Sequence, residues 1–339
     1  MAMQGNVTIK TVAQETGLSL TTVSRVLNGT AEKYRISEAT QAAVLAEAKK
    51  QGYIPNMAAK TLRLNKSRTI GLIVPTLNNP FFSLVASTVS KLLYAQGYVV
   101  LMSDCANDPE EERKLIKTFL TQNIEGILAI PVGGRKNYEL LEKGGVPTVF
   151  IDRFFEESKI PYVATDHFDS AFKLMEHLVE HGHTLIACIQ GDVQTISNQY
   201  RVKGYLEALK KHNIGYSYLK GGSFTTDEGY LETKILLKQS QKPTAIMALS
   251  DTILLGALKA IREEGMSIPE DISVVSIDNS SYLDFLSVPI TSVSHPITEI
   301  TQLAIKMLLD QMGASQASAP TNIVLEAKLI ARKSVQYIP

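Results

Sequence analysis

The feature that most constrains this chain is an alternation of short apolar runs with amphipathic stretches, sustained from residue 69 to about residue 280. The runs are rich in Val and Ile, and the stretches between them have the length and spacing of helices. Strands that alternate with helices predict βα units and parallel sheets buried on both faces. There are too many runs for one small sheet, so we expect two doubly wound lobes.

The apolar runs form two series. The first comprises "TIGLIVPT", "YVVLMSD", "EGILAIP" and "PTVFIDR", with predicted helices over 81–97, 109–123 and 137–144. The second comprises "YVATD", "TLIACIQG", "SYLKGG", "TAIMALSD" and "DISVVSID", with predicted helices over 168–182, 196–212, 226–239 and 252–265. Ligands of such sheets bind beyond the carboxyl ends of the strands. The polar residues at those ends are therefore site candidates: Asn78, Asn79, Asp104, Asp152, Arg153, Asp251, Asp278 and Asn279.

The stretch "SLTTVSRVLNG" (19–29) predicts a short helix with an unusual outer face. Ser19 is a favourable N-cap, and Gly29 stands where a helix tends to end. One side carries apolar packing residues, whereas the other carries Thr21, Arg25 and Asn28 and no acid. This face suits an anionic, hydrogen-bonding partner. The alternative is an ordinary solvated face.

The first 56 residues predict an all-helical module. A helix over 8–17, capped by Thr8 and closed by Gly17, precedes the 19–29 helix, and a third follows over 37–52. Two short helices joined by a tight glycine turn are the helix-turn-helix pattern. Residues 53–68 are then a linker able to form a helix.

The charge distribution agrees with a nucleic-acid partner. Residues 1–68 hold ten Lys or Arg against four Glu, a net charge of +6, and the chain as a whole is neutral. A basic module ahead of an acidic body is typical of nucleic-acid binding, although charge alone does not exclude a membrane surface.

Length, apolar runs and cysteines indicate the number of domains and the cellular location. A chain of 339 residues suggests two or three domains. No run of about 18 apolar residues occurs and no export signal precedes the first helix, so we expect no membrane span and a cytoplasmic location. Cys105 and Cys188 fall in or beside strand-like runs, which indicates buried free thiols rather than a disulfide.

Enzyme motifs are weak or missing. "HLVEH" (177–181) has metalloprotease-like spacing but no evident further zinc ligand. The sequence contains no G-x-G-x-x-G, G-x-x-x-x-G-K-S/T or G-x-S-x-G motif. We therefore expect no catalytic residues, no metal and no cofactor.

Taken together, ordered fragments of the chain resemble the lactose-repressor/galactose-repressor family of bacterial transcription regulators. They are "TIKTVAQETGLSLTTVSRVLNG", "GYIPNMAAKTLR", "TIGLIVPTLNNPFF", "VPTVFIDR", "RVKGYLEALKKHNI", "KPTAIMALSD", "IPEDISVVSIDNS" and "ITSVSHP". The resemblance, over about residues 7–335, implies an all-α helix-turn-helix headpiece and an α/β core like a periplasmic sugar-binding protein. It implies a headpiece at 1–56, a hinge helix at 57–68, one lobe at 69–160 plus 291–320, and the other at 161–290 plus 321–339.

The resemblance also implies which residues contact DNA. Leu20, Thr21 and Arg25 are expected to reach base edges, and an arginine can bond guanine bidentately. Leu20 packed against the first helix is the alternative. Contacts that orient the duplex are expected from Thr8, Ser19, Thr22, Ser24, Asn28 and Asn56.

The hinge carries a separate expectation. Leu62 matches a leucine that wedges into the minor groove, with Lys60 and Arg63 beside it for phosphates. A plain apolar residue on a short helix is the alternative for Leu62. A hinge helix of about eight residues is unstable alone, so we expect a homodimer on a near-palindromic, double-stranded DNA operator. The C-terminus has no leucine heptad that would build a tetramer.

In the core, the resemblance implies a site for a small polar effector, a sugar or related metabolite, between the lobes. The carried-over residues are Asn79, Phe81, Phe82, Asp152, Arg201, Phe224, Ser250, Asp251, Asp278 and His295. Ser250 and His295 depart from the asparagine and glutamine frequent at their positions. Phe81 and Phe82 as core residues, and Arg201 in a structural ion pair, are the alternatives. Arg135 and Lys136 favour an acidic ligand only if they point inward.

Two functions remain open at this stage. One is a DNA-binding regulator, most simply a repressor, whose operator affinity is controlled by the effector. The other is a solute-binding protein that carries a sugar without binding DNA. The basic headpiece and the missing export signal favour the regulator, with induction and corepression both open.

Overall fold

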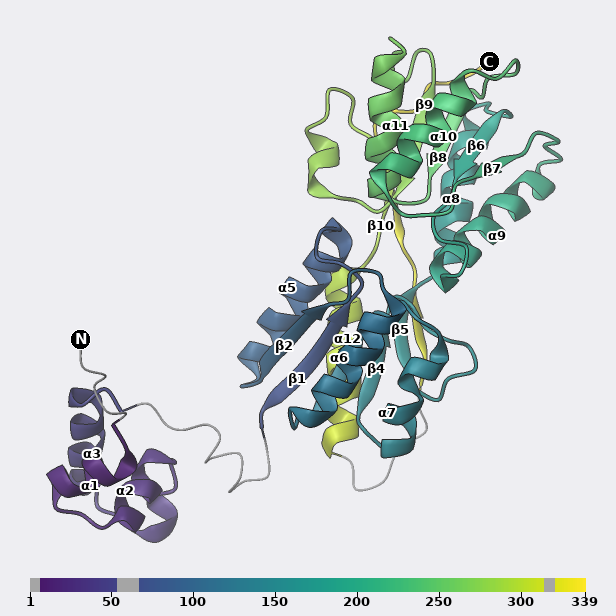
Figure 1. Ribbon diagram of the computed structural model, residues 1–339. Coiled ribbons are helices and arrows are strands. Elements are labelled where there is room, and N and C mark those ends of the chain that lie inside the picture. Colours follow the sequence, from purple (N-terminus) through teal and green to yellow (C-terminus); the bar gives the residue numbers. More distant parts are fainter. Residues whose placement is uncertain (1–6, 54–66, 314–320) are drawn as a thin grey trace. The chain divides into compact units, whose positions relative to one another are not determined.

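The computed structural model describes residues 7–53, 67–313 and 321–339. The chain divides into two compact units, one before Arg68 and one from Arg68 to Pro339 (Figure 1). Each unit has its own hydrophobic core, and each is described here by itself.

The N-terminal unit is a three-helix module. Its elements are α1 (Ile9–Thr16), α2 (Leu20–Leu27), the short 3-10 helix η1 (Glu32–Tyr34) and α3 (Glu38–Lys50). A hydroxyl side chain caps the N-terminus of each α-helix. The oxygens of Thr8, Ser19 and Ser37 accept hydrogen bonds from the backbone amides three residues further along the chain. Gly17 ends α1 in the left-handed conformation. The predicted helix-turn-helix is therefore confirmed.

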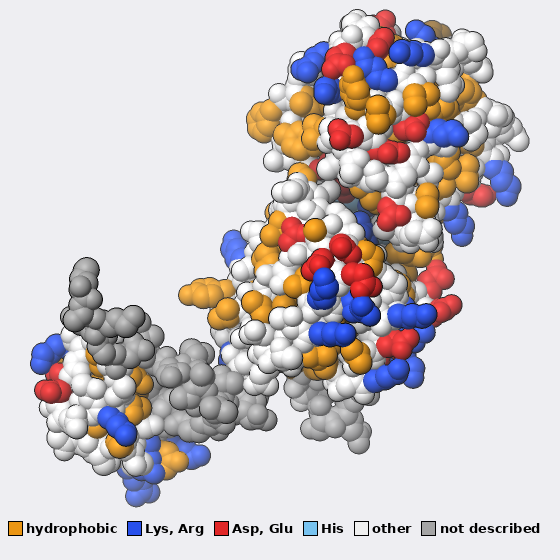
Figure 2. Space-filling model, viewed as in Figure 1, with side chains coloured by type: hydrophobic (Ala, Val, Ile, Leu, Met, Phe, Trp, Pro, Cys, Tyr) orange, Lys and Arg blue, Asp and Glu red, His pale blue; other side chains and the backbone are white. Residues whose placement is uncertain are grey.

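A small core holds the three helices together. Its most buried members are Val12, Val23 and Val44, one from each α-helix. The outer faces are left for solvent or a partner, and the charged side chains visible on this unit are mostly Lys and Arg (Figure 2).

The C-terminal unit contains two six-stranded sheets. The first has the order β11 (Ile323–Leu325), β5 (Tyr162–Thr165), β4 (Thr148–Ile151), β3 (Gly126–Ala129), β1 (Thr69–Val74), β2 (Val99–Asp104), all parallel. The second has the order β12 (Lys328–Ile330), β10 (Thr291–Ser294), β9 (Ser273–Ile277), β8 (Ala245–Ala248), β6 (Ile186–Ile189), β7 (Tyr218–Lys220), with only β12 antiparallel.

Helices cover both faces of each sheet, so the predicted doubly wound lobes are confirmed. On the first sheet, α5 (Pro80–Ala95) and α12 (Ile297–Gly313) pack on one face, and α6 (Pro109–Thr121) and α7 (Glu139–Gly144) on the other. On the second sheet, α8 (His167–Glu180) and α9 (Ile196–Lys211) face α10 (Thr226–Leu237) and α11 (Asp251–Glu263) across the sheet. Two further 3-10 turns are η2 (Arg135–Tyr138) and η3 (Ser281–Asp284).

The chain passes between the lobes three times, but not where the resemblance implied. β5 pairs with β4, so the first lobe extends past residue 160 to residue 165. β10 pairs with β9 in the second sheet, so the first lobe resumes only with α12. β11 pairs with β5, and the last passage falls between Leu325 and Lys328. Backbone pairing partners decide lobe membership, and periodicity does not encode them.

Two other expectations concern cysteines and membranes. Cys105 and Cys188 are both buried free thiols, as predicted. In the described ranges, no helix combines the length and apolar character needed to cross a bilayer.

Two glycines allow α10 and α11 to pack closely. A Cβ on Gly229 would lie 2.1 Å from the Ile253 carbonyl oxygen, and a Cβ on Gly256 would lie 2.0 Å from that of Thr226. The two helices begin at Thr226 and Asp251. The close approach of α10 and α11 therefore brings together the segments that follow β7 and β8, two strands of the second lobe.

We predict that Gly256→Ala destabilises the C-terminal unit by about 1–3 kcal/mol, because the new methyl group meets backbone that cannot rotate away. Thermal unfolding followed by calorimetry measures the effect. Gly215→Ala is the matched control, since no atom lies within 4 Å of the added Cβ. Equal melting temperatures for the two variants would contradict the packing argument.

Candidate functional site

A cavity of about 320 Å³ lies between the two lobes, at the carboxyl ends of strands from both sheets. Eight of the sequence-predicted effector residues line it. Asn79, Phe81, Phe82 and Asp152 come from the first lobe, and Arg201, Phe224, Ser250 and Asp278 from the second. The cavity therefore contacts both lobes, as a site that senses lobe orientation requires.

The aromatic wall of the cavity begins at the start of α5. The Asn79 side chain caps this helix, accepting bonds from the amides of Phe81 (2.9 Å) and Phe82 (3.4 Å). The two rings pack edge to face, 5.4 Å apart, and both also belong to the first lobe's core. These rings therefore pack in the core of the first lobe and also line the cavity, and their contact with a ligand stays a prediction.

Arg201 lies on α9, whose backbone approaches α8 closely at Gly204. Its side chain is only 5% exposed. One terminal nitrogen donates to the Leu249 carbonyl oxygen (2.9 Å), and the other lies 3.4 Å from Nδ1 of His167. Among the described residues no carboxylate forms an ion pair with Arg201, so the ion-pair alternative is wrong.

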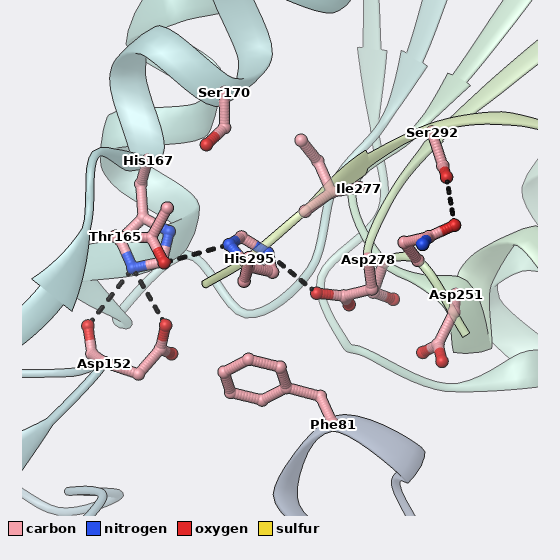
Figure 3. Close-up of polar contacts among 12 residues, drawn as sticks. Phe81, Asp152, Thr165, His167, Ser170, Asp251, Ile277, Asp278, Ser292 and His295 are labelled. Carbon is pink, nitrogen blue, oxygen red and sulfur yellow. Dashed lines mark hydrogen bonds and ion pairs between the residues drawn. The ribbon is translucent and has the colours of Figure 1, made fainter. Parts of the chain in front are cut away.

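Two buried histidines connect the lobes at the passages between them (Figure 3). Nε2 of His167 lies 3.4 Å from a carboxylate oxygen of Asp152 and 3.1 Å from the Asp152 carbonyl oxygen. Nδ1 of His295 lies 3.0 Å from the Thr165 hydroxyl, and its Nε2 lies 3.0 Å from the Asp278 carboxylate. Each histidine therefore contacts a residue of the other lobe, Asp152 for His167 and Thr165 for His295. Each also lies against one aspartate of the cavity wall, Asp152 or Asp278.

Two predicted residues do not line the cavity. His295 stands behind it, between Asp278 and Thr165. Asp251 is fully buried at the first turn of α11 and accepts a hydrogen bond from the Ser280 hydroxyl. The place of Asp251 at a strand end predicts it in the site, and the resemblance implies His295 there, but both side chains are buried behind the cavity wall.

The buried groups of this region have displaced pKa values. Burial lowers the pKa of His167 to about 4, and the charge of Arg201 acts in the same direction against that of Asp152. Burial, together with the nearby charge of Asp278, raises the pKa of Asp251 to about 7. Burial also acts to raise the pKa of Asp278, but the contact with His295 and the charge of Arg201 outweigh it and hold that pKa below its usual range.

Sequence reasoning noticed Arg153 as a strand-end residue but did not place it in the site. Its guanidinium is 7% exposed and lies 5.2 Å from the centroid of the Phe82 ring and 5.7 Å from that of Phe224. The preceding Asp152 has φ of 64°, and the Arg153 amide donates to the Ile151 carbonyl oxygen, which closes a tight turn. That turn lets adjacent residues face one cavity, and no sequence signal announces it. Other lining residues that were missed are Thr76, Asn107, Ser197, Thr225, Thr226 and Thr252.

The Ser250 side chain caps a helix, and the basic pair Arg135 and Lys136 lies outside the cavity. The Ser250 hydroxyl caps α11 by accepting from the Ile253 amide (3.2 Å). Arg135 pairs with Glu142 (3.3 Å) and Lys136 is exposed, and neither lines the cavity. The condition that would have favoured an acidic ligand through this basic pair is not met.

The outer face of α2 offers exposed contact residues. Leu20 is 45% exposed, so its packing against α1 is incomplete, and Thr21 is exposed beside it. The Arg25 guanidinium lies 3.6 Å from the centroid of the Tyr34 ring, a stacking partner that sequence reasoning missed. This contact limits where the long side chain can go.

The remaining predicted DNA residues make local bonds or lie elsewhere. The hydroxyls of Thr8, Ser19 and Thr22 take part in helix capping, and the Asn28 side chain donates to the Ser24 carbonyl oxygen. Asn56, Lys60, Leu62 and Arg63 lie outside the described residues.

The "HLVEH" helix brings two histidines together. The rings of His177 and His181 lie 4.3 Å apart, and Nδ1 of His181 is 2.7 Å from the His177 carbonyl oxygen. In the part of the chain that the structure describes, no group of three or more His, Cys, Asp or Glu is arranged to hold a metal ion.

Comparisons with known proteins agree with this arrangement. The family model "Bacterial regulatory proteins, lacI family" matches residues 8–56, and "Periplasmic binding protein-like domain" matches residues 175–335. The HTH-type transcriptional repressor CytR of Escherichia coli K12 is 33% identical over 337 residues, covering 98% of this chain and 97% of that protein.

Two solved structures are similar over much of the chain. A lac repressor dimer bound to operator and the anti-inducer ONPF has a TM-score of 0.88 at 26% identity, covering 97% of this chain and 99% of that one. A LacI family transcriptional regulator from Enterococcus faecium with bound ribose has a TM-score of 0.72 at 26% identity, covering 80% and 100%.

The displaced pKa of His167 predicts an acid-sensitive stability. Between pH 6.5 and about 4 the unfolded chain takes up a proton on this residue and the folded chain does not, so stability falls as the pH falls. From pH 7 to pH 4.5, wild type should lose about 2 kcal/mol more unfolding free energy than His167→Gln, which has no titrating ring.

Urea unfolding at the two pH values measures this difference. His181→Gln is the control, because His181 lies outside the cavity and its loss should leave the wild-type sensitivity in place. If His167→Gln retained the full acid sensitivity of wild type, His167 would not be the responsible group.

Proposed function

This chain belongs to the lacI family of bacterial regulatory proteins, and we propose that it is a repressor whose affinity for its operator is set by a sugar or sugar derivative bound between the lobes. It is a helix-turn-helix transcriptional regulator that binds DNA and responds to a small-molecule effector. The observation that carries the proposal is a cavity lined by buried polar groups from both lobes. The relatives it matches are repressors rather than enzymes, and we assign it no catalysis and no cofactor.

On the DNA side, we assign base contacts to Leu20, Thr21 and Arg25. The exposure of Leu20 and Thr21 at the start of α2 supports this role, and the half-buried Arg25 stacks on Tyr34. The backbone of the duplex is then held by Thr8, Ser19, Thr22, Ser24, Asn28 and Asn56. Lys60, Leu62 and Arg63 act in the proposed hinge at 57–68, with Leu62 as the minor-groove wedge.

On the effector side, Asp152 and Asp278 accept hydrogen bonds from hydroxyl groups of the effector. Arg201 donates hydrogen bonds to hydroxyl oxygens of the effector. Phe82 and Phe224 supply apolar faces for C–H groups. Ser250 contributes from the start of α11, whereas Asp251 and His295 act by holding the wall. The ribose bound in the Enterococcus faecium relative supports a sugar as the ligand class.

Effector binding and DNA binding are coupled through lobe orientation. A ligand that contacts both lobes favours one of their relative arrangements, and that arrangement sets the spacing of two headpieces. The similar lac repressor dimer bound to operator supports a homodimer. We place this homodimer on a near-palindromic site, since a two-fold symmetric dimer reads two matching half-sites, and we assign it to the cytoplasm.

The DNA half is tested by retention of the full chain on an operator selected from a random-sequence duplex pool. Retention should fall steeply with salt, because phosphate contacts release counterions. Arg25→Ala should lose about 1–3 kcal/mol of discrimination at the guanine it contacts. Lys49→Ala removes the same charge from the exposed end of α3 and should keep the sequence preference. A chain that only carries a solute would show no retention.

The effector half is tested by titrating operator affinity with sugars, sugar phosphates and purines. Arg201→Ala should weaken the response at least about tenfold, because bonds from a charged donor are lost, yet leave DNA affinity nearly intact. Arg113→Ala, an exposed arginine on α6, is the control and should respond as wild type. Equal loss of effector response and DNA affinity would contradict the role given to Arg201.

A further inference from the structure

The cavity between the lobes contains two buried arginines. Arg153 and Arg201 come from different lobes, line the same cavity, and are 7% and 5% exposed. Burial lowers the pKa of Arg153, the charge of Arg201 acts in the same direction, and the charge of Asp152 opposes both. Two positive charges of this kind are costly to bury unless something negative satisfies them.

Protein groups leave most of the arginine donors unused. A guanidinium carries five N–H donors. Within the described ranges, Arg153 makes one long bond, to the Pro131 carbonyl oxygen (3.5 Å), and its Nε has no partner. Arg201 bonds Leu249 and His167 but its Nε likewise has no partner. Neither arginine forms an ion pair with any described carboxylate.

The nearby carboxylates are engaged elsewhere. Asp152 faces His167, Asp278 faces His295, and Asp251 accepts from Ser280. Asp192, whose charge also reaches Arg153, accepts a bond from the Gln194 amide. Asp152 and Asp278 therefore act on the two arginines through their charge, but within the described ranges no carboxylate forms a hydrogen bond or ion pair with either guanidinium.

Arg153 is held in place without being neutralised. The rings of Phe82 and Phe224, one from each lobe, lie beside its guanidinium. Aromatic rings stabilise a cation through their faces, but they do not accept hydrogen bonds as a carboxylate does. The side chain is therefore positioned, and its forked donors suit an acidic group, which they bind bidentately.

The opposite character appears on the aspartate side of the cavity. Asp152 and Asp278 present acceptors, which suit hydroxyl groups. The volume of about 320 Å³ lies at the small end for ligand sites and suits a monosaccharide-sized molecule.

We propose that the effector is an anionic monosaccharide derivative, a sugar acid or a sugar phosphate, whose acidic group binds Arg153 while its hydroxyls bind the aspartates. This inference rests on the proposed effector site and adds a ligand class and a specificity-determining residue to it. The basic residues that do this are Arg153 and Arg201, since Arg135 and Lys136 do not line the cavity.

The test is calorimetric titration of the full chain at constant ionic strength with two matched series. One is D-glucose, D-glucuronate and D-glucose 6-phosphate, and the other is D-ribose, D-ribonate and D-ribose 5-phosphate. At least one acid should bind about tenfold or more tightly than its neutral parent, as expected for bonds to a charged group. The carboxylate and phosphate arms distinguish the two sources of negative charge.

Three variants assign the preference to Arg153. Arg153→Gln should bring the acid-to-neutral affinity ratio close to one, and Arg153→Lys, which keeps the charge without the fork, should retain part of it. Lys136→Gln removes the same charge from an exposed position and should leave the ratio unchanged. The melting temperature of each variant, compared with that of wild type, shows whether the C-terminal unit is folded.

The proposal is overturned if neutral sugars bind as tightly as their acids, if Arg153→Gln keeps the preference, or if no acid binds. The first outcome leaves the proposed regulator intact with a neutral effector. Loss of salt-dependent DNA retention by wild type, by contrast, would remove the regulator itself.

Discussion

Two buried carboxylates, each facing a histidine, are the constraint on which the cavity depends. Asp152 and Asp278 end strand-derived segments in different lobes, and an ionised carboxylate without partners is too costly to bury. His167 and His295 meet this requirement from segments that connect the lobes. The same contacts that make burial possible therefore tie the cavity wall to the segments that pass between the lobes.

A similar solution supports the first lobe next to the cavity. Glu112 on α6 is fully buried and accepts bonds from the amides of Val132 (2.7 Å) and Gly133 (2.9 Å). It also accepts from the Tyr138 hydroxyl (2.6 Å), and the pKa of that hydroxyl is raised far above its ordinary value by burial and by this carboxylate. The loop so held begins at Pro131, whose carbonyl oxygen receives the one bond made by the Arg153 guanidinium. A buried acid thus helps to set the position of a buried base without pairing with it.

The cavity is a place where several local preferences meet. Asn79 and Ser250 both cap helices that start at strand ends, and the rings of Phe81 and Phe82 follow directly from the first cap. Capping is a short-range effect, so these residues could be recognised from sequence. The tight turn at Asp152 depends on bonds between neighbouring strands, so the inclusion of Arg153 could not.

Sequence reasoning predicted the order and type of the described α-helices and strands up to β9, the caps of the three headpiece helices and eight residues of the cavity wall. The elements and the caps follow from periodicity and short-range hydrogen bonding, which act over a few residues. Of the eight wall residues, Asn79, Asp152 and Asp278 follow from their places at strand ends, and the family resemblance implied the other five. Only the tertiary structure decided that β5 and β11 belong to the first sheet, that His295 and Asp251 stand behind the wall, and that Tyr34 stacks on Arg25. These features depend on contacts between different segments of the chain and on the few partners available to buried charges. Neither dependence leaves a pattern along the sequence.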